Sequence, residues 1–326
     1  MEKTPKYLFE LMQDNIELAK YEVEQLLDCS LTHVFGGVYI TTDDINQELL
    51  FRLAYTKQVC QIMQNITNIS ETQLNLPSES FKVTFLSENE LPLNEREPYY
   101  DVISDGTNES PVSLTKPQHT YVFLLTNTII LTKQLFENKK GYWNRTPNKR
   151  PRFHPTSMSP KVAKAMINMA GPKAKVIHDP FCGTGGILIE SLHNKLAFIA
   201  GDIDIDMLES AEINVKDDIN KYPDMPTQSM LFELVSALET THKSDAILSD
   251  VPYGKNTKSV GDIDTLYTRF LTHAHAHNLS DQIIFCVPDK SNLAKLGQQH
   301  GWKLKKEITE FVHKSLTRHI LHFLRT

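Results

Sequence analysis

Long apolar runs and paired cysteines are both missing from this 326-residue chain. A membrane helix needs roughly 18 consecutive apolar residues, and the most apolar stretch, 121–131, is interrupted by three polar ones. The N-terminus has no basic segment followed by an apolar core, so we expect neither a secretion signal nor a membrane partner. Cys29, Cys60, Cys182 and Cys286 form no CxxC pair. This pattern argues against a zinc site or a disulfide framework and favours a reducing, cytoplasmic location.

The net charge of −6 hides a strong asymmetry along the chain. Residues 1–110 carry 19 acidic and 7 basic side chains, whereas residues 133–175 carry 11 basic side chains and one acidic side chain. A basic segment of this kind indicates a polyanionic partner. The alternative is a solvated linker whose lysines have no partner.

The sequence pattern of the first half of the chain is typical of a small α+β unit. Apolar spacing predicts strands at 7–11 and 38–41, an amphipathic helix at 15–27, and a helix that Asp43 or Asp44 caps and that runs to about residue 55. Residues 119–131 are rich in strand-forming residues. Residues 66–110 are polar and have few apolar anchors, so their pattern does not place any element there.

Residues 138–157 contain prolines, glycines and several basic side chains, which is typical of a semi-rigid linker. Beyond it, a helix at 162–170 is followed by strands that alternate with helices, which is the pattern of an α/β fold with a parallel sheet. The ligand of such a sheet binds at the carboxyl ends of its strands. The predicted strands are 175–179, 197–202, 246–249 and 282–287, the helices are 186–193, 207–215, 266–276 and 293–300, and a terminal strand pair lies at 302–311 and 319–323.

A glycine-rich turn, DPFCGTGG at 179–186, lies between a predicted strand and a predicted helix. Its glycines let a ligand approach the backbone, and the amides at the helix start are free donors. Asp202 ends the next strand, 19 residues beyond Gly183, where a carboxylate can accept hydrogen bonds from ribose hydroxyls. The spacing fits a nucleotide-like ligand, either a dinucleotide or S-adenosylmethionine. The turn reads GxGG rather than GxGxxG, and the chain contains no P-loop.

This turn resembles motif I of class I S-adenosylmethionine-dependent methyltransferases, in the form found in RNA guanine-N2 enzymes. The resemblance implies that Asp179, Gly183, Thr184 and Gly185 line the methionine part of the cofactor and that Asp202 holds its ribose. It also implies cofactor contacts by Phe181, Gly186, Ile203, Ser236, Ala237, His154 and Ser157. Ser236 stands where relatives usually carry an acid that reads the adenine amine.

A second motif resembles the [D/N]PPY sequence of methyltransferases that alkylate exocyclic amines. It consists of Asp250, Val251, Pro252 and Tyr253. The lone pair of such an amine is delocalised into the ring. A carboxylate and a backbone carbonyl that accept its two N–H groups would turn the lone pair toward the methyl donor. Tyr253 can stack on a base that has left the helix. Val251 replaces the first proline, but its backbone carbonyl is retained.

Two further stretches narrow the resemblance. Residues 145–160, RTPNKRPRFHPTSMSP, and residues 312–318, VHKSLTR, are similar to segments of archaeal-type tRNA guanine-N2-methyltransferases that modify guanosine 10. The resemblance implies a ferredoxin-like unit at 1–65, a THUMP RNA-binding domain at 66–137, a basic linker at 138–158 and a methyltransferase domain at 159–326. The expected fold is therefore α/β, a class I Rossmann-like domain with a C-terminal antiparallel strand pair, preceded by an α+β region.

The sequence thus predicts a tRNA methyltransferase that uses S-adenosylmethionine to methylate guanine N2. The alternatives are N2-methylation at tRNA position 6 or in ribosomal RNA, amine methylation of adenine in DNA, and a non-catalytic THUMP protein with a degenerate cofactor site. Whether a small activator protein is also needed stays open. We expect no metal site, since His273 and His277 share a helix face but have no third ligand. The predicted RNA contacts are Lys139, Lys140, Arg145, Lys149, Arg150 and Arg152.

Overall fold

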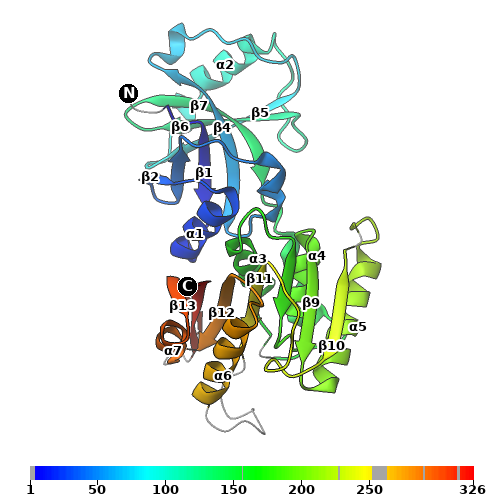
Figure 1. The fold of residues 1–326 in the computed structure, drawn as a ribbon. Helices are drawn as coiled ribbons and strands as arrows, with labels where there is room; N and C mark the ends of the chain where they lie inside the picture. Colours follow the sequence, from blue (N-terminus) through cyan, green and yellow to red (C-terminus); the bar gives the residue numbers. More distant parts are fainter. Residues whose placement is uncertain (1–3, 156, 227, 252–262, 289–290, 314–315) are drawn as a thin grey trace. The chain divides into compact units, whose positions relative to one another are not determined.

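A computed structural model describes residues 4–155, 157–226, 228–251, 263–288, 291–313 and 316–326 of the chain (Figure 1). The chain forms two compact units. The first comprises Met1–Ile16, Cys29–Leu50 and Thr56–Lys139, and the second comprises Glu17–Asp28, Phe51–Tyr55 and Lys140–Thr326. Two short N-terminal segments therefore belong to the unit that the C-terminal half of the chain builds.

The first unit is built on a seven-stranded sheet of order β2-β3-β1-β4-β7-β6-β5. Only β5 and β6 pair in parallel, and the other neighbours are antiparallel. Helix α2 (Glu97–Gly106) buries Val102 and Ile103 in one core with Phe81 and Phe123 of the sheet. The strands are β1 (Tyr7–Leu11), β2 (Thr32–Phe35), β3 (Val38–Thr41), β4 (Thr56–Ile66), β5 (Phe81–Ser87), β6 (His119–Leu125) and β7 (Ile129–Glu137).

In the first 110 residues one prediction was wrong, and one region that the sequence left unassigned contains regular structure. The helix expected from Asp43 is only a short 3-10 helix, η1 (Gln47–Arg52), because the Asp43 carboxylate accepts the Ser30 N–H at 2.9 Å instead of capping a helix. The region without a predicted element contains β5 and α2, together with the 3-10 helices η2 (Ile69–Glu71) and η3 (Leu93–Glu95).

The second unit confirms the predicted α/β architecture. Its sheet has the order β10-β9-β8-β11-β12-β14-β13, with β10 to β12 parallel and the β13–β14 pair antiparallel. This is the strand order of class I methyltransferases, and the strand order reverses between the parallel neighbours β8 and β11, where ligands of such sheets bind. The strands are β8 (Val176–Asp179), β9 (Ala197–Asp202), β10 (Met230–Leu234), β11 (Ala246–Asp250), β12 (Gln282–Pro288), β13 (Trp302–His313) and β14 (Leu316–Arg325).

Helices cover both faces of this second sheet. The pleat alternates side chains, so Leu321 and Phe323 of β14 join the core under α6 and α7, whereas His322 points the other way and hydrogen-bonds Tyr21 of α1. A second core joins α4 and α5 to β9. The helices are α1 (Ile16–Leu27), α3 (Pro160–Met169), α4 (Gly186–His193), α5 (Ile205–Lys221), α6 (Ile263–Ala276) and α7 (Leu293–Gln299).

Candidate active site at the carboxyl ends of β8, β9 and β11

Three acidic residues end three neighbouring strands of the second sheet. Asp179 ends β8, Asp202 ends β9 and Asp250 ends β11, and β8 pairs with both of the other strands. Because the carboxyl ends of parallel strands meet at one edge, the three carboxylates lie at the same edge of the sheet, on both sides of the point where the strand order reverses. The structure therefore brings the three predicted site acids to the same edge of the sheet.

The glycine turn after β8 has the backbone that its sequence predicts. Gly183 has φ +50° and Gly185 has φ +81°, both in the left-handed region. A Cβ on Gly185 would lie 3.1 Å from Ala211 of α5, closer than ordinary van der Waals contact, and the positive φ would strain any larger residue there. Gly186 then begins α4. A Cβ on Gly183 would meet nothing within 4 Å. The turn therefore leaves open space beside Gly183, where a ligand can lie against the backbone.

Asp202 is held in place by the backbone around it. Its Oδ2 accepts the Gly183 N–H at 2.9 Å and its Oδ1 accepts the Asp204 N–H at 3.0 Å. Burial raises the pKa of this carboxyl, and the two backbone hydrogen bonds oppose the rise. The next side chain, Ile203, is 74% exposed. A fixed acceptor beside an exposed apolar side chain fits the ribose and the base of a nucleoside-like ligand.

Asp179 lies deeper than the other two acids. Its Oδ1 accepts the Ser249 hydroxyl at 2.7 Å and the Phe181 N–H at 3.2 Å. Burial raises its pKa to about 7; these hydrogen bonds oppose the rise, and the neighbouring Asp202 and Asp250 add to it. A cation placed beside these acids would lower that pKa and stabilise the charged form.

Asp250 ends β11 with two unlike carboxylate oxygens. Its Oδ2 lies 3.2 Å from the guanidinium of Arg318 on β14, whereas the buried Oδ1 has no hydrogen-bond partner among the described residues. Burial raises the pKa of Asp250 to about 6, and Arg318 and Cys286 oppose the rise. The buried Val251 that follows donates its N–H to the Cys286 carbonyl at 3.2 Å. Pro252 and Tyr253 lie outside the described residues.

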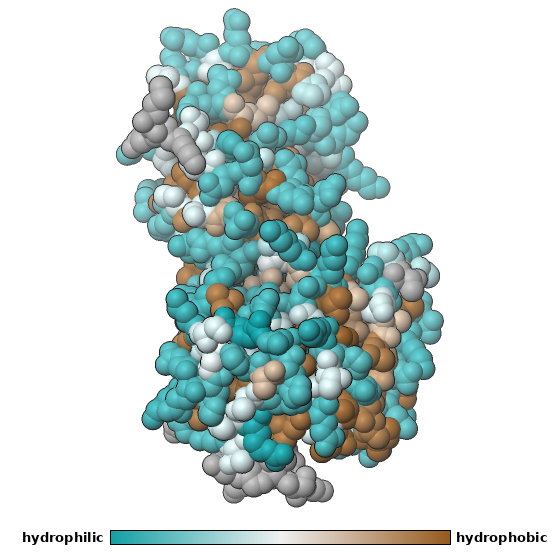
Figure 2. All heavy atoms as spheres, in the orientation of Figure 1, coloured by the Kyte–Doolittle hydropathy of each residue, from teal (hydrophilic) through white to brown (hydrophobic). Residues whose placement is uncertain are grey.

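The remaining predicted cofactor residues lie near the glycine turn or follow β10. The Ser157 hydroxyl is 3.0 Å from the Thr184 hydroxyl, and the Ser157 N–H donates to the His154 carbonyl at 3.1 Å. After β10, the Ser236 hydroxyl accepts the Leu238 N–H at 3.2 Å, and Ala237 is buried. The Ser236 hydroxyl, which the family resemblance places near the adenine amine, therefore accepts a hydrogen bond within its own turn. Figure 2 shows apolar atoms gathered on the β10 side of this unit.

Two of the predicted RNA contacts are corrected by the structure. The Arg145 guanidinium is buried and forms two hydrogen bonds to Glu190 of α4, at 2.8 and 2.7 Å. Arg150 is also buried and donates its Nε–H to the Arg145 carbonyl at 3.1 Å. Burial in the second unit removes both guanidinium groups from solvent. Lys139, Lys140, Lys149 and Arg152 are exposed.

The segment that carries these residues is anchored to the second unit rather than free. It forms the 3-10 helices η4 (Gly141–Arg145) and η5 (Pro147–Lys149), and Tyr142 is buried. The Asn214 side chain of α5 accepts the Arg152 N–H at 2.8 Å and donates to the Arg152 and Thr184 carbonyls, each at 2.9 Å. Asn214 thereby links this segment directly to the glycine turn.

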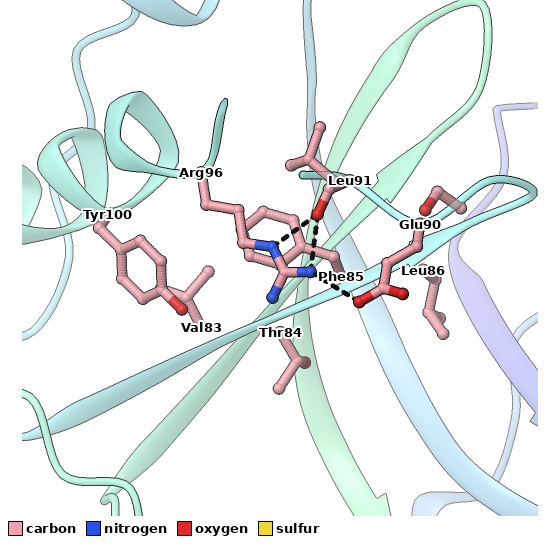
Figure 3. A pocket seen from close by; sticks show the side chains of 9 residues that line it. Val83, Thr84, Phe85, Leu86, Glu90, Leu91, Arg96 and Tyr100 are labelled. Carbon is pink, nitrogen blue, oxygen red and sulfur yellow. Dashed lines mark hydrogen bonds and ion pairs between the residues drawn. The ribbon is translucent and has the colours of Figure 1, made fainter. Parts of the chain in front are cut away.

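A pocket of about 410 Å³ lies in the first unit, between β5 and the start of α2 (Figure 3). Arg96 lies in it with its guanidinium 5.4 Å from the centre of the Phe85 ring. The same group donates to the Leu91 carbonyl and pairs with Glu90 at 3.3 Å. Since these contacts already engage the cation, we assign this pocket no catalytic role.

The described residues contain neither a membrane-spanning helix nor a cluster of metal ligands. No helix in the described ranges combines the length and apolar character needed to cross a membrane. Within the same ranges, no group of three or more His, Cys, Asp or Glu side chains is placed to hold a metal ion. His273 instead contacts the Thr240 carbonyl at 2.7 Å through its Nε2.

The family model of the RMKL-like methyltransferase domain matches residues 147–192 and 191–320. The chain belongs to this family. The match covers the glycine turn, the three strand-end acids and Arg318, which are the residues that build the site described above. It also includes η5, so the family pattern begins within the basic segment.

Relatives with curated names agree with this assignment. A tRNA (guanine(10)-N2)-dimethyltransferase of Methanothermobacter thermautotrophicus is 35% identical over 215 residues, which is 64% of this chain and 60% of that protein. The protein of the same name from Methanocaldococcus jannaschii is 32% identical over 227 residues, 67% of this chain and 61% of that protein. The chain thus spans about 60% of the length of these relatives.

A solved structure is similar over nearly the whole chain. The crystal structure of TrmN from Thermus thermophilus has a TM-score of 0.49 and 17% identity, covering 98% of this chain and 99% of that one. The family assignment rests on the family model, and the fold class rests on the strand order of the second sheet.

The sequence analysis missed two residues that complete the site. Ser249 holds Asp179, and Arg318 holds Asp250. Ser249 directly precedes the predicted catalytic motif, and Arg318 ends the stretch 312–318 that carried the family resemblance. That stretch was the available signal, but the sequence alone assigned no role to its arginine.

Proposed function

We propose that this protein transfers a methyl group from S-adenosylmethionine to the exocyclic N2 of a guanosine in tRNA, at position 10. The observation that carries the proposal is the Asp250 carboxylate at the end of β11, with one oxygen held by Arg318 and the other buried without a hydrogen-bond partner in the part of the chain that the structure describes. The names of the curated relatives support the choice of guanine N2 and of position 10.

In this proposal Asp250 accepts one N–H of the amine and the Val251 carbonyl accepts the other. The two acceptors turn the nitrogen lone pair toward the methyl group. The N–C bond forms as the sulfonium S–C bond breaks, S-adenosylhomocysteine leaves, and the surplus proton of the amine passes through Asp250 to water. Pro252 and Tyr253 complete the motif in the sequence, and stacking of Tyr253 on the target base stays a prediction.

The methyl donor fits the residues around the glycine turn. The open space beside Gly183 accommodates its amino-acid part, and Asp179 supplies negative charge for the ammonium and the sulfonium. Asp202 serves the ribose hydroxyls, since each of its oxygens has accepted one hydrogen bond and retains a further lone pair. Ile203 offers an exposed apolar surface to the adenine.

We propose that four exposed basic residues contact tRNA phosphates. They are Lys139, Lys140, Lys149 and Arg152. Their charge is concentrated in one segment, while residues 1–110 are acidic.

We also propose the domain division that the family resemblance implies: a ferredoxin-like unit at 1–65, a THUMP domain at 66–137, a linker at 138–158 and a methyltransferase domain at 159–326. Burial of Arg145 in the second unit supports counting most of the linker segment with the methyltransferase unit.

We also propose a cytoplasmic location for the protein. Its four cysteines are buried and none of them is in a disulfide, as expected in a reducing compartment. The transfer assay below also tests whether an activator protein is needed, because turnover by the purified chain alone would exclude that requirement.

The test is a methyl-transfer assay with purified protein, labelled S-adenosylmethionine and an unmodified tRNA transcript. We expect N2-methylated guanosine in the nucleoside digest, and its mass distinguishes one added methyl group from two. A transcript with adenosine at position 10 should give no product. Product that persists on that transcript would place the modification elsewhere. A wild-type protein that binds S-adenosylhomocysteine but methylates no transcript would contradict the proposal for the purified chain.

A further inference from the structure

Arg318 is the cation that lies against the proposed catalytic carboxylate. It belongs to β14, which pairs with β12, and β12 in turn pairs with β11, the strand that Asp250 ends. Its guanidinium reaches Oδ2 of Asp250 at 3.2 Å, and its side chain is 8% exposed. Such a buried arginine is not available to tRNA phosphates, so its role lies inside the second unit.

The pairing treats the two oxygens of Asp250 differently. Oδ2 faces the guanidinium, while Oδ1 is buried and accepts no hydrogen bond from the described residues. A buried acceptor without a partner is costly, because its lost hydration is not replaced. A buried acceptor without a partner is expected where a bound ligand supplies the missing hydrogen-bond donor. An exocyclic amine is such a donor.

The charges around Asp250 make its ionisation depend on Arg318. Asp179 on β8 and Asp202 on β9 are acidic neighbours at the same sheet edge, and the thiol of Cys286 faces Asp250 from β12. Glu310 on β13 lies opposite Arg318 in the strand register. Burial raises the pKa of Asp250 to about 6, and Arg318 is the strongest influence that lowers it. Without that cation, less of the carboxylate would be ionised at neutral pH.

We infer that Arg318 is a positioning residue for methyl transfer: it fixes one carboxylate oxygen of Asp250 and keeps the group ionised, so that the other oxygen can accept an N–H of the substrate amine. Arg318 acts through Asp250 and does not touch the substrate. This inference rests on the proposed function, because it names the group that prepares the same acceptor.

The experiment compares Arg318→Met with Arg318→Lys in the full-length chain. For Arg318→Met we expect kcat at pH 7 to fall by about 10- to 100-fold and the acid limb of the kcat–pH profile to move up by about one to three pH units. The affinity for S-adenosylhomocysteine should change less than twofold. Arg318→Lys should return the acid limb close to its wild-type position while kcat stays reduced, because lysine restores the charge but not the guanidinium geometry.

Arg325→Met is the matched control, since Arg325 lies on the same strand and pairs with the exposed Asp281 at 3.0 Å. It should leave kcat and the pH profile unchanged. If Arg318→Met changes only the thermal stability and the cofactor affinity, with an unmoved acid limb, Arg318 is a structural residue and the inference is wrong.

A second readout does not depend on turnover. In protein labelled with carboxyl-¹³C aspartate, the resonance missing from Asp250→Asn identifies Asp250, and its titration gives the pKa directly. We expect the pKa to rise in folded Arg318→Met and not in Arg325→Met. An unchanged pKa would overturn the inference. A wild-type enzyme without activity would overturn the proposed function instead, while this titration would still decide the role of Arg318.

Discussion

The second unit contains two carboxylate–guanidinium pairs whose arginines are buried and whose carboxylates differ. Glu190 of α4 is fully buried, and both of its oxygens accept hydrogen bonds from Arg145, at 2.8 and 2.7 Å. Asp250 meets Arg318 through one oxygen at 3.2 Å, and its other oxygen is left without a partner among the described residues. The arginine is buried in both pairs, but the Asp250 side chain is 19% exposed and leaves an acceptor available, whereas Glu190 does not.

The difference separates a structural pair from a functional one. A bidentate pair with both oxygens satisfied is a strong arrangement, and here it fastens the segment that contains η4 and η5 to α4. In the pair at Asp250, burial outweighs the cation, so the pKa of the carboxyl rises to about 6. A carboxylate that is held on one side, and is ionised at neutral pH, is ready to accept a hydrogen bond from a ligand.

The largest expected effect comes from removing the acceptor itself. Asp250→Asn keeps the shape of the side chain but replaces one carboxylate oxygen with a donor group and removes the charge. We expect kcat to fall by about 100- to 1,000-fold, the size of effect seen when one hydrogen-bonding group that stabilises the transition state is lost. Asp250→Ala should abolish activity as well. Single-turnover kinetics with unmodified tRNA measure the loss, and isothermal titration should show cofactor affinity within twofold of wild type. Full activity in either variant would exclude this mechanism.

Breaking the Glu190–Arg145 pair should lower the stability of the fold. Glu190→Gln leaves the Arg145 charge buried without its counterion, so we expect a loss of about 3 to 5 kcal/mol in the free energy of unfolding. Urea denaturation followed by fluorescence measures this loss. Glu212→Gln is the control, since Glu212 forms an exposed pair with Lys216 at 2.8 Å, and we expect a change below about 0.5 kcal/mol there. Similar losses of unfolding free energy in both variants would show that the Glu190–Arg145 pair stabilises the fold no more than an exposed pair does.

Cofactor binding should release protons through Asp179. The pKa of this carboxyl is about 7 in the folded protein, above its ordinary value. The folded state therefore holds more protons than the unfolded state between about pH 4 and pH 7, and the stability of the ligand-free protein falls as pH rises through that window. A bound ammonium and sulfonium would lower this pKa, so affinity for S-adenosylmethionine should rise by about tenfold from pH 5.5 to 7.5.

Calorimetry at pH 6.5 in buffers of different ionisation enthalpy measures the released protons. 5′-Methylthioadenosine lacks the amino-acid part and the sulfonium charge, so it should release few protons and bind with little pH dependence. Equal proton release by both ligands would show that Asp179 does not sense the cationic part of the cofactor.

The smallest effects are expected at the exposed basic residues. Lys149→Gln or Arg152→Gln should weaken tRNA binding by roughly threefold at physiological salt, and each should reduce the slope of log K against log salt by about one. Filter binding at several salt concentrations measures both quantities. An unchanged slope in both variants would remove these side chains from the tRNA interface.

Local patterns in the sequence predicted most of the second unit. The helix at Gly186–His193 and the strand at Ala197–Asp202 were predicted with the observed bounds, because the glycine turn and the apolar runs mark their ends. In the first unit β1 and β3 were also correct. Strand β4 was missed, because its polar-rich sequence is held extended by pairing with β1 and β7, and this pairing depends on residues far along the chain.

The same limit applies to the site. The acids at the ends of the strands are marked by neighbouring residues, so the sequence could identify them. The partners of the charged groups are not marked in this way. Arg145 meets Glu190, 45 positions away, and a count of basic side chains cannot distinguish such a buried group from an exposed one. Arg318 lies beside Asp250 only because β12 and β14 pair.

The central claim is that the free oxygen of Asp250 directs methyl transfer to guanine N2, and one measurement tests it most directly. Wild-type protein and Asp250→Asn are incubated with S-adenosylmethionine and two tRNA transcripts that differ only in guanosine or inosine at position 10, since inosine lacks the N2 amine. The account predicts N2-methylated guanosine at position 10 for the wild-type protein with the guanosine transcript alone. A methylated inosine transcript, or full product from Asp250→Asn, would contradict it.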